Sequence, residues 1–108
     1  MVRSKSEIEI IANKYVDMIN KFIYVKQAYI FGSYAYGTPN ENSDLDIAIV
    51  SPDFNYLPEA PTLKMLLRAA RHIDSTIEPV ALTEEEINNP LPGSVAIDIK
   101  NRGIKVNV

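Results

Sequence analysis

Two carboxylates separated by a single residue, Asp44 and Asp46, are the feature of the sequence with the clearest chemical potential. Side chains two apart on an extended strand point to the same face, so these carboxylates would project together. Convergent carboxylates repel, and one pKa rises unless a cation compensates them. Magnesium is commonly held by one or two carboxylates together with phosphates, so the pair predicts a magnesium site.

The setting of this pair separates it from the other acid pairs of the chain. Because about 25% of an average chain is charged, one such pair is expected by chance at this length. Glu7 with Glu9, and Glu84 with Glu86, occur in helical settings and are better explained as solvated surface charge. Asp46 instead precedes an uninterrupted apolar run, where an uncompensated charge at the edge of a core is costly.

A small polar turn, Gly32-Ser33, precedes the pair, and ten residues separate Ser33 from Asp44. One interpretation is a plain turn at the end of a strand, where glycine supplies a backbone conformation that other residues resist. The other is that bare backbone amides and the Ser33 hydroxyl, at the start of a short helix, hold a triphosphate. Gly37 then lets the chain turn back toward the next strand.

Helices and strands alternate around these residues. Apolar residues at helical spacing predict helices over 6–22 and 62–73, and short apolar runs predict strands over 27–31, 45–50 and 76–82. Pro79 cannot donate to a ladder, so the third strand is expected at an edge or a bulge. Thr83 is expected to cap a short acidic helix, and 94–101 fits either a strand or a helix capped by Ser94. The pattern predicts an α/β (α+β) fold with one small sheet.

Length and composition limit the architecture. The 108 residues allow one domain, 1–108, and the hydrophobic and charged fractions of 46% and 23% are those of an ordinary globular chain. The net charge of -3 disfavours direct nucleic-acid binding, which depends on clustered Lys and Arg. Without cysteine, only oxygen ligands and the lone His72 remain for a metal, and His72 is expected at the surface. No apolar run resembles a signal peptide or a membrane span, so we expect a cytoplasmic protein.

The segments 31–37 (FGSYAYG) and 43–50 (SDLDIAIV) together resemble the signature of the DNA polymerase β-type nucleotidyltransferase superfamily. In size the chain is similar to the minimal nucleotidyltransferases, which are the antitoxins of two-gene modules whose toxin is a HEPN-domain ribonuclease. The resemblance covers residues 28–82. It implies the polymerase β-like fold, a small mixed sheet flanked by helices.

The resemblance also implies catalytic roles. A third carboxylate belongs on a later strand, where Glu78 matches; an exposed edge-strand acid is the alternative reading of Glu78, and Asp74 is the fallback candidate. Two magnesium ions would be held by Asp44, Asp46 and Glu78, with Glu78 also accepting the proton of the attacking hydroxyl. Ser33 and the Gly32 amide would grip the terminal phosphates of ATP.

Two departures from the family pattern concern the turn and the third acid. Many relatives carry basic residues around Tyr34 or Tyr36, whereas both positions are tyrosine here. These rings are expected to pack against the sheet, with base stacking and modification as alternatives. At the third acidic position Glu78 replaces the commoner aspartate, which changes the reach of the side chain but not its charge.

Arg102, between Lys100 and Lys105, belongs to a mildly basic tail that we expect at the surface or at a partner interface.

The leading functional hypothesis is an antitoxin that transfers AMP from ATP to a HEPN-domain toxin. The first alternative is an antitoxin that neutralises its partner by binding alone. A small-molecule nucleotidyltransferase is a second alternative, although such relatives carry an extra domain to complete the substrate cleft. An α/β interaction domain that binds magnesium incidentally is a third. Homo- and hetero-oligomers are both compatible with the sequence.

Overall fold

Four strands form one mixed sheet in the computed structural model, which describes residues 2–108. The strand order is β3-β2-β1-β4; β1 is antiparallel to β2 and to β4, and β2 is parallel to β3. A parallel pair needs a crossover connection, which here includes a helix. The expected small mixed sheet flanked by helices is confirmed. The strands are β1 (Gln27–Phe31), β2 (Leu45–Val50), β3 (Ile77–Leu82) and β4 (Ile104–Val106).

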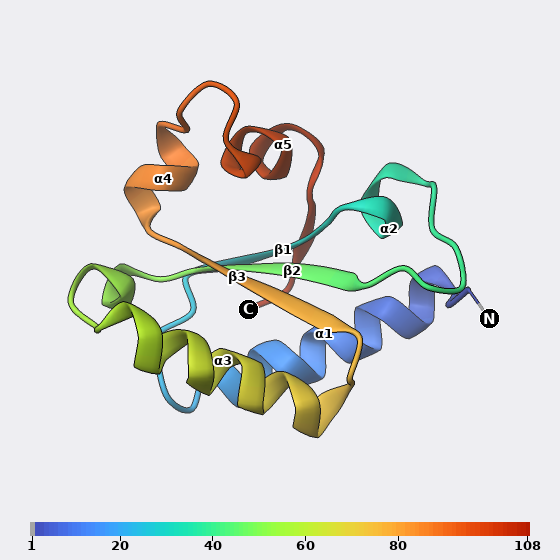
Figure 1. Cartoon of the computed structure of the whole chain (residues 1–108), viewed down its shortest axis with the longest axis horizontal. Coiled ribbons are helices and arrows are strands. Elements are labelled where there is room, and N and C mark those ends of the chain that lie inside the picture. Colours follow the sequence, from blue (N-terminus) through green and yellow to red (C-terminus); the bar gives the residue numbers. More distant parts are fainter. Residues whose placement is uncertain (1) are drawn as a thin grey trace.

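Helices cover both faces of the sheet (Figure 1). In the described chain, α1 (Lys5–Ile19) and α3 (Glu59–Ile73) pack on one face, and α4 (Glu84–Asn88) and α5 (Val95–Arg102) lie over the other. A single turn, α2 (Ser33–Tyr36), and a 3-10 turn, η1 (Pro52–Asn55), belong to the connections. Among residues 2–108 there is no helix with the length and apolarity needed to cross a membrane.

The two faces of the sheet carry different side chains of the same strands. Along β2, Leu45, Ile47 and Ile49 belong to the core under α1 and α3, whereas Ala48 and Val50 belong to the core under α4 and α5. This alternation is the period of two that a strand imposes. Even-numbered positions of β2 therefore face α4 and α5, and this decides which face receives the acidic residues.

Helix α1 begins at a capping box and ends sooner than its apolar spacing predicts. The Glu7 backbone N–H donates to Ser4 Oγ at 3.2 Å, and the Ser4 N–H donates to Glu7 Oε1 at 3.0 Å. The expected helix 6–22 is wrong at its C-terminal end, because α1 ends at Ile19 and Phe22 is 66% exposed. The Asn20 side chain accepts the Val25 N–H at 2.9 Å, which holds the chain in a turn toward β1.

Helix α3 begins three residues earlier than the predicted span of 62–73. Proline at position 61 suggested a loop, yet Pro61 lies in the first turn of the helix. Backbone N–H groups of a first helical turn have no intrahelical acceptor, so the missing N–H of proline costs nothing there. Residues 51–61, which follow the predicted strand 45–50 and whose three prolines suggest a loop, are therefore partly helical, since they contain η1 and the start of α3.

Strand β3 lies at the edge of the sheet, as Pro79 predicts. The Leu45 N–H donates to the Thr76 carbonyl at 2.9 Å and the Ser51 N–H donates to the Leu82 carbonyl at 3.1 Å. Backbone groups of alternate residues thus face β2, and Pro79 falls among those facing the open side. Its missing donor removes no ladder hydrogen bond.

The C-terminal segment is a helix followed by a strand. Of the two interpretations left open for 94–101, the helix is the observed one, with Ser94 at the N-cap position of α5. Ser94 does not cap through its side chain, and its buried Oγ has no hydrogen-bond partner within residues 2–108. Strand β4 was not expected from its three residues; it forms because β1 offers an unpaired edge.

The buried hydroxyl of Tyr15 provides a test of how α1 and α3 are joined. Tyr15 is fully buried, and its Oη donates to the Leu66 carbonyl at 2.8 Å. We expect Tyr15→Phe to lower the free energy of unfolding by about 1 kcal/mol, because a buried hydrogen bond is lost while the ring is kept. Urea unfolding followed by circular dichroism measures this, with Tyr56→Phe, at 86% exposure, as a control that should change nothing.

Candidate active site

Strand pairing brings the Gly32 turn next to two of the predicted acids, Asp46 and Glu78. Phe31 on β1 lies opposite Asp46 on β2, and Asp46 lies opposite Glu78 on β3. Gly32 directly follows Phe31, so the turn, Asp46 and Glu78 lie next to one another across three adjacent strands. Asp46 and Glu78 share the alternation of residues facing α4 and α5, and Asp44 immediately precedes β2.

The Gly32 turn is shaped by direct contact with Asp46. Gly32 has φ 73° and ψ -154°, a region open essentially to glycine alone. A Cβ at this position would overlap Asp46 Oδ2, so the carboxylate lies against the bare α-carbon. The Ala35 and Tyr36 N–H groups both donate to the Gly32 carbonyl at 3.0 Å, and Gly37 ends the turn at φ 82°. The short helix expected after Gly32 is confirmed.

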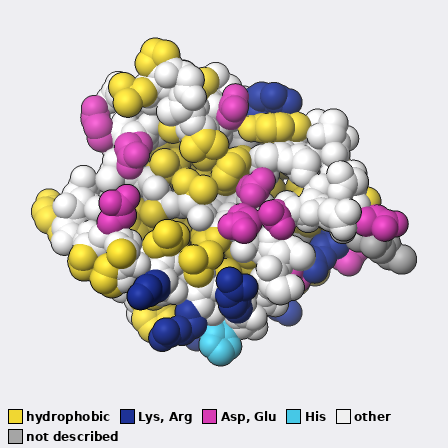
Figure 2. All heavy atoms as spheres, in the orientation of Figure 1, with side chains coloured by type: hydrophobic (Ala, Val, Ile, Leu, Met, Phe, Trp, Pro, Cys, Tyr) yellow, Lys and Arg dark blue, Asp and Glu magenta, His cyan; other side chains and the backbone are white. Residues whose placement is uncertain are grey.

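The acids influence one another electrostatically. Burial, with the negative charges of Asp44 and Glu78, raises the pKa of Asp46 from its ordinary value of 3.8 to about 6. Both ion pairs found within residues 2–108 lie elsewhere, between Arg3 and Asp74 and between Lys26 and Glu84. In Figure 2 acidic side chains gather near the middle of the view, while basic ones gather mainly over α3. The acidic cluster therefore has no compensating cation among the described side chains.

The acidic cluster suits a hard cation without being a finished metal site. Within residues 2–108, no three His, Asp or Glu side chains are arranged as ready ligands for one ion. Magnesium is usually bound by one or two carboxylates, with water and phosphate oxygens completing its shell. Asp44 and Asp46 supply the right donor type, and burial together with the charges of Asp44 and Glu78 raises the pKa of Asp46. These residues fit a magnesium ion that arrives with phosphate.

The fallback acid, Asp74, is engaged elsewhere. Its Oδ2 pairs with Arg3 at 2.6 Å, and its Oδ1 accepts the Thr76 N–H at 2.9 Å. Partial burial opposes the effect, but the hydrogen bonds from Thr76 and Arg3 and the charge of Arg3 lower the pKa of Asp74. Asp74 thus stabilises the α3–β3 connection, and the acids whose charges act on Asp46 are Asp44 and Glu78. His72 is exposed, as expected.

The two tyrosines of the turn have different surroundings. Tyr34 packs against the core under α1 and α3, and its Oη accepts the Arg3 N–H at 3.3 Å. Above the ring of Tyr36 lies Arg102 of α5, with its Cζ 3.7 Å from the ring centroid. Packing of Tyr34 agrees with expectation. The Arg102 contact was missed, because nothing in the local sequence links two residues so far apart along the chain.

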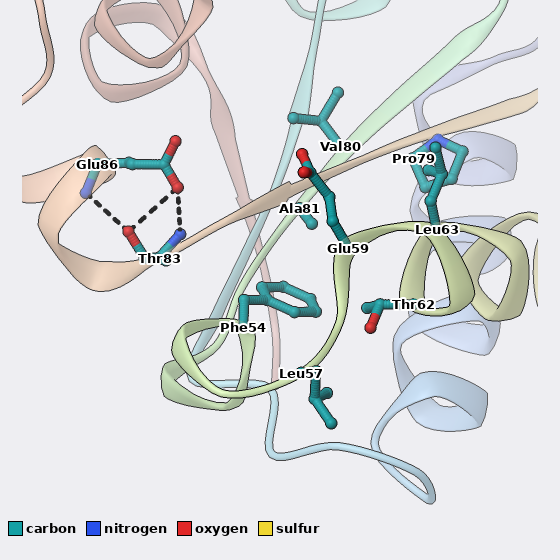
Figure 3. A pocket seen from close by; sticks show the side chains of 10 residues that line it. All are labelled: Phe54, Leu57, Glu59, Thr62, Leu63, Pro79, Val80, Ala81, Thr83 and Glu86. Carbon is teal, nitrogen blue, oxygen red and sulfur yellow. Dashed lines mark hydrogen bonds between the residues drawn. The ribbon is translucent and has the colours of Figure 1, made fainter.

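A cleft of about 460 Å³ opens beside the edge strand, away from the acids (Figure 3). Phe54 and Leu57 from the β2–α3 connection lie at one side, and the Thr83–Glu86 capping box lies at another. Asp44, Asp46 and Glu78 do not line it, but Pro79 does, and Pro79 follows Glu78 on β3. The cleft therefore places apolar side chains such as Phe54 and Leu57 next to the exposed edge of β3, near Glu78.

Comparison with known protein families identifies the family to which this chain belongs. Residues 11–106 match the model of the nucleotidyltransferase domain. The chain therefore belongs to the nucleotidyltransferase domain family, and the predicted family membership is confirmed. The reaction for which this family is named is nucleotidyl transfer.

Two proteins of Methanocaldococcus jannaschii, both named "putative protein adenylyltransferase", are similar in sequence. The first, MJ0604, is 40% identical over 65 residues, which are 59% of this chain and 64% of the relative. The match therefore spans less than two thirds of that relative. The second, MJ1379, is 28% identical over 89 residues, which are 82% of this chain and 87% of the relative.

Solved structures share the fold. A Sulfolobus solfataricus protein described as a "putative nucleotidyltransferase" aligns with a TM-score of 0.61 and 26% identity, over 82% of this chain and 83% of its own. A toxin-antitoxin crystallised with AMP-PNP aligns with a TM-score of 0.61 and 24% identity, over 87% of this chain and 70% of its own. At that identity the second likeness shows the fold alone.

Replacement of Gly32 tests the contact with Asp46. Gly32→Ala is expected to cost about 2 kcal/mol or more in free energy of unfolding, because it combines backbone strain with overlap on Asp46. Gly37→Ala is the matched control: Gly37 also has positive φ, but nothing lies within 4 Å of an added Cβ, so about 1 kcal/mol is expected. Equal losses in urea unfolding would show that the contact with Asp46 carries no energy.

Asp46→Asn tests the electrostatic cost of the acidic cluster. A carboxyl whose pKa is about 6 when folded and 3.8 when unfolded makes the protein less stable as pH rises from about 4 to about 6. Asp46→Asn removes this penalty, and because solvent screens a half-buried charge we expect about 1 kcal/mol of stabilisation at pH 7.5. In magnesium-free thermal unfolding, the gain in Tm should be smaller at pH 4.5. A variant less stable than the parent at pH 7.5 contradicts the prediction.

Proposed function

We propose that this chain is a single minimal nucleotidyltransferase domain that transfers AMP from ATP, with magnesium, to a protein acceptor, a HEPN-domain toxin. The observation that carries the proposal is the alignment of Gly32, Asp46 and Glu78 across three adjacent strands. Membership of the nucleotidyltransferase family supports the reaction type. The adenylyltransferase names of the sequence relatives support a protein acceptor, and the toxin-antitoxin neighbour supports the toxin partner.

Gly32 and Ser33 are assigned to the phosphates of the nucleotide. At Gly32 the absence of a side chain lets the Asp46 carboxylate lie directly against the turn, so the turn and this proposed cation ligand can act on the same phosphates. Ser33 is the first residue of α2, and in this scheme its hydroxyl donates to a phosphate oxygen. Both groups bind and orient the triphosphate so that its α-phosphorus faces the acids.

Asp44 and Asp46 are assigned to the nucleotide-bound magnesium, and Glu78 shares a second ion with them. When bound, magnesium neutralises charge on the phosphate oxygens and on the leaving pyrophosphate. The carboxylates contribute by holding this charge at a defined place, the start of β2 and β3. Burial and the charges of Asp44 and Glu78 raise the pKa of Asp46, and a bound cation would relieve both effects.

Glu78 is assigned to the acceptor side of the reaction. It is exposed on the edge strand β3, where a hydroxyl of a second protein can reach it. In the transfer, the hydroxyl oxygen forms a bond to the α-phosphorus, the bond to pyrophosphate breaks, and the hydroxyl proton passes to the Glu78 carboxylate. Positioning and charge stabilisation account for most catalysis of this kind, so a small scaffold suffices.

Intact-mass spectrometry of the product of the adjacent gene tests the proposal. After incubation of that product with this protein, ATP and magnesium, we expect a mass gain of one or more AMP units. Asp46→Asn should slow the transfer by about 100-fold or more, because a cation ligand is lost. Asp17→Asn, an exposed acid on α1, removes the same charge away from the site and should leave the rate unchanged.

The same measurement separates the proposal from its rivals. A stable complex with no mass gain for any of the four nucleotides would sink the catalytic proposal and leave an antitoxin that acts by binding. Transfer to a small molecule and not to the protein would contradict the assigned acceptor. Unchanged transfer by Asp46→Asn would contradict the assigned site.

A further inference from the structure

The contact between Arg102 and Tyr36 places a cation of α5 on the short helix that follows Gly32. Arg102 is the last residue of α5 and Tyr36 is the last residue of α2, and the guanidinium carbon lies 3.7 Å from the ring centroid. The Tyr36 N–H donates to the Gly32 carbonyl at 3.0 Å, so the Tyr36 backbone lies one helical turn after Gly32. Figure 1 shows α5 and α2 over the same side of the sheet.

Sheet topology independently places Arg102 at the acidic end. Strand β4 begins at Ile104, which pairs with Ile30 near the end of β1, and Gly32 follows β1 directly. Helix α5 packs on the face toward which Asp46 points. Arg102, two residues before β4, therefore lies at the same end and over the same face of the sheet as the acids.

The charge of Arg102 is available to a ligand. Neither ion pair of residues 2–108 includes Arg102, whose side chain is exposed. Stacking of a cation on an aromatic ring near the surface contributes little to stability. The stack does orient the planar guanidinium, whose N–H groups can donate to an anion. Guanidinium matches phosphate through paired hydrogen bonds, which a flexible lysine does not reproduce.

We propose that Arg102, held on the ring of Tyr36, is a phosphate-binding residue that contacts the β- and γ-phosphates of the nucleotide. This inference rests on the proposed function, since it requires a nucleoside triphosphate at Gly32 and Ser33. Tyr36 is then a positioning residue that acts through Arg102. The C-terminal helix contributes in this way to a site whose other members all precede residue 79.

Nucleotide titrations with ATP, ADP and AMP, each with magnesium, test the assignment. We expect Arg102→Gln to weaken ATP binding about 10- to 100-fold, because a charge-assisted hydrogen bond is lost, while AMP binding changes little. Arg102→Lys should restore only part of the affinity. Lys105→Gln, an exposed cation on β4, is the matched control and should bind ATP like the parent. Tyr36→Phe keeps the ring and should retain ATP affinity, whereas Tyr36→Leu should lose part of it.

Each contrary outcome has a distinct meaning. Unchanged ATP affinity in Arg102→Gln, with the parent binding ATP, would overturn the assignment of Arg102 and leave the proposed function standing. Equal losses for ATP and AMP, together with a lowered Tm, would make Arg102 a structural residue and overturn the assignment as well. A parent protein that binds none of the three nucleotides would sink the proposed function, and this inference with it.

Discussion

Strand β2 is hydrogen-bonded to a neighbour on each edge and buried on both faces, and this double pairing places the candidate site. Antiparallel pairing with β1 brings the Gly32 turn to the start of β2, against Asp46. Parallel pairing with β3 brings Glu78 to the other side of Asp46. A slip of one residue in either register would turn a whole set of side chains to the opposite face, so the apolar alternation that builds the core also holds the site together.

The same arrangement carries an electrostatic cost. The acids lie where β2 enters the core, and the pKa of Asp46 rises to about 6 because burial and two neighbouring carboxylates disfavour its charge. The apolar rest of β2, fully buried from Ile47 to Val50, offsets that cost. Functional sites often lower the stability of a protein in this way.

Elements bounded by strong local signals were predicted to the residue, and elements without them were not. Both β1 and β2 are apolar runs bounded by turn residues, and their observed limits are those expected from sequence. Helix α1 was predicted too long because Phe22 continues the apolar spacing, although the Asn20 side chain has already turned the chain. Helix α3 was predicted too short because Pro61 reads as a breaker unless its place in the first turn is known.

The sequence by itself determined the glycine turn, the Asp44 and Asp46 pair, and the strands that end and begin there, because their spacing lies within one local stretch of backbone. Only the tertiary structure showed that the β2–β3 register puts Glu78 beside Asp46, whereas Asp74 pairs with Arg3. It alone revealed β4 and the stack of Arg102 on Tyr36. These features depend on contacts between distant parts of the chain, which form only when the sheet pairs and the helices pack, and no local pattern of residues encodes them.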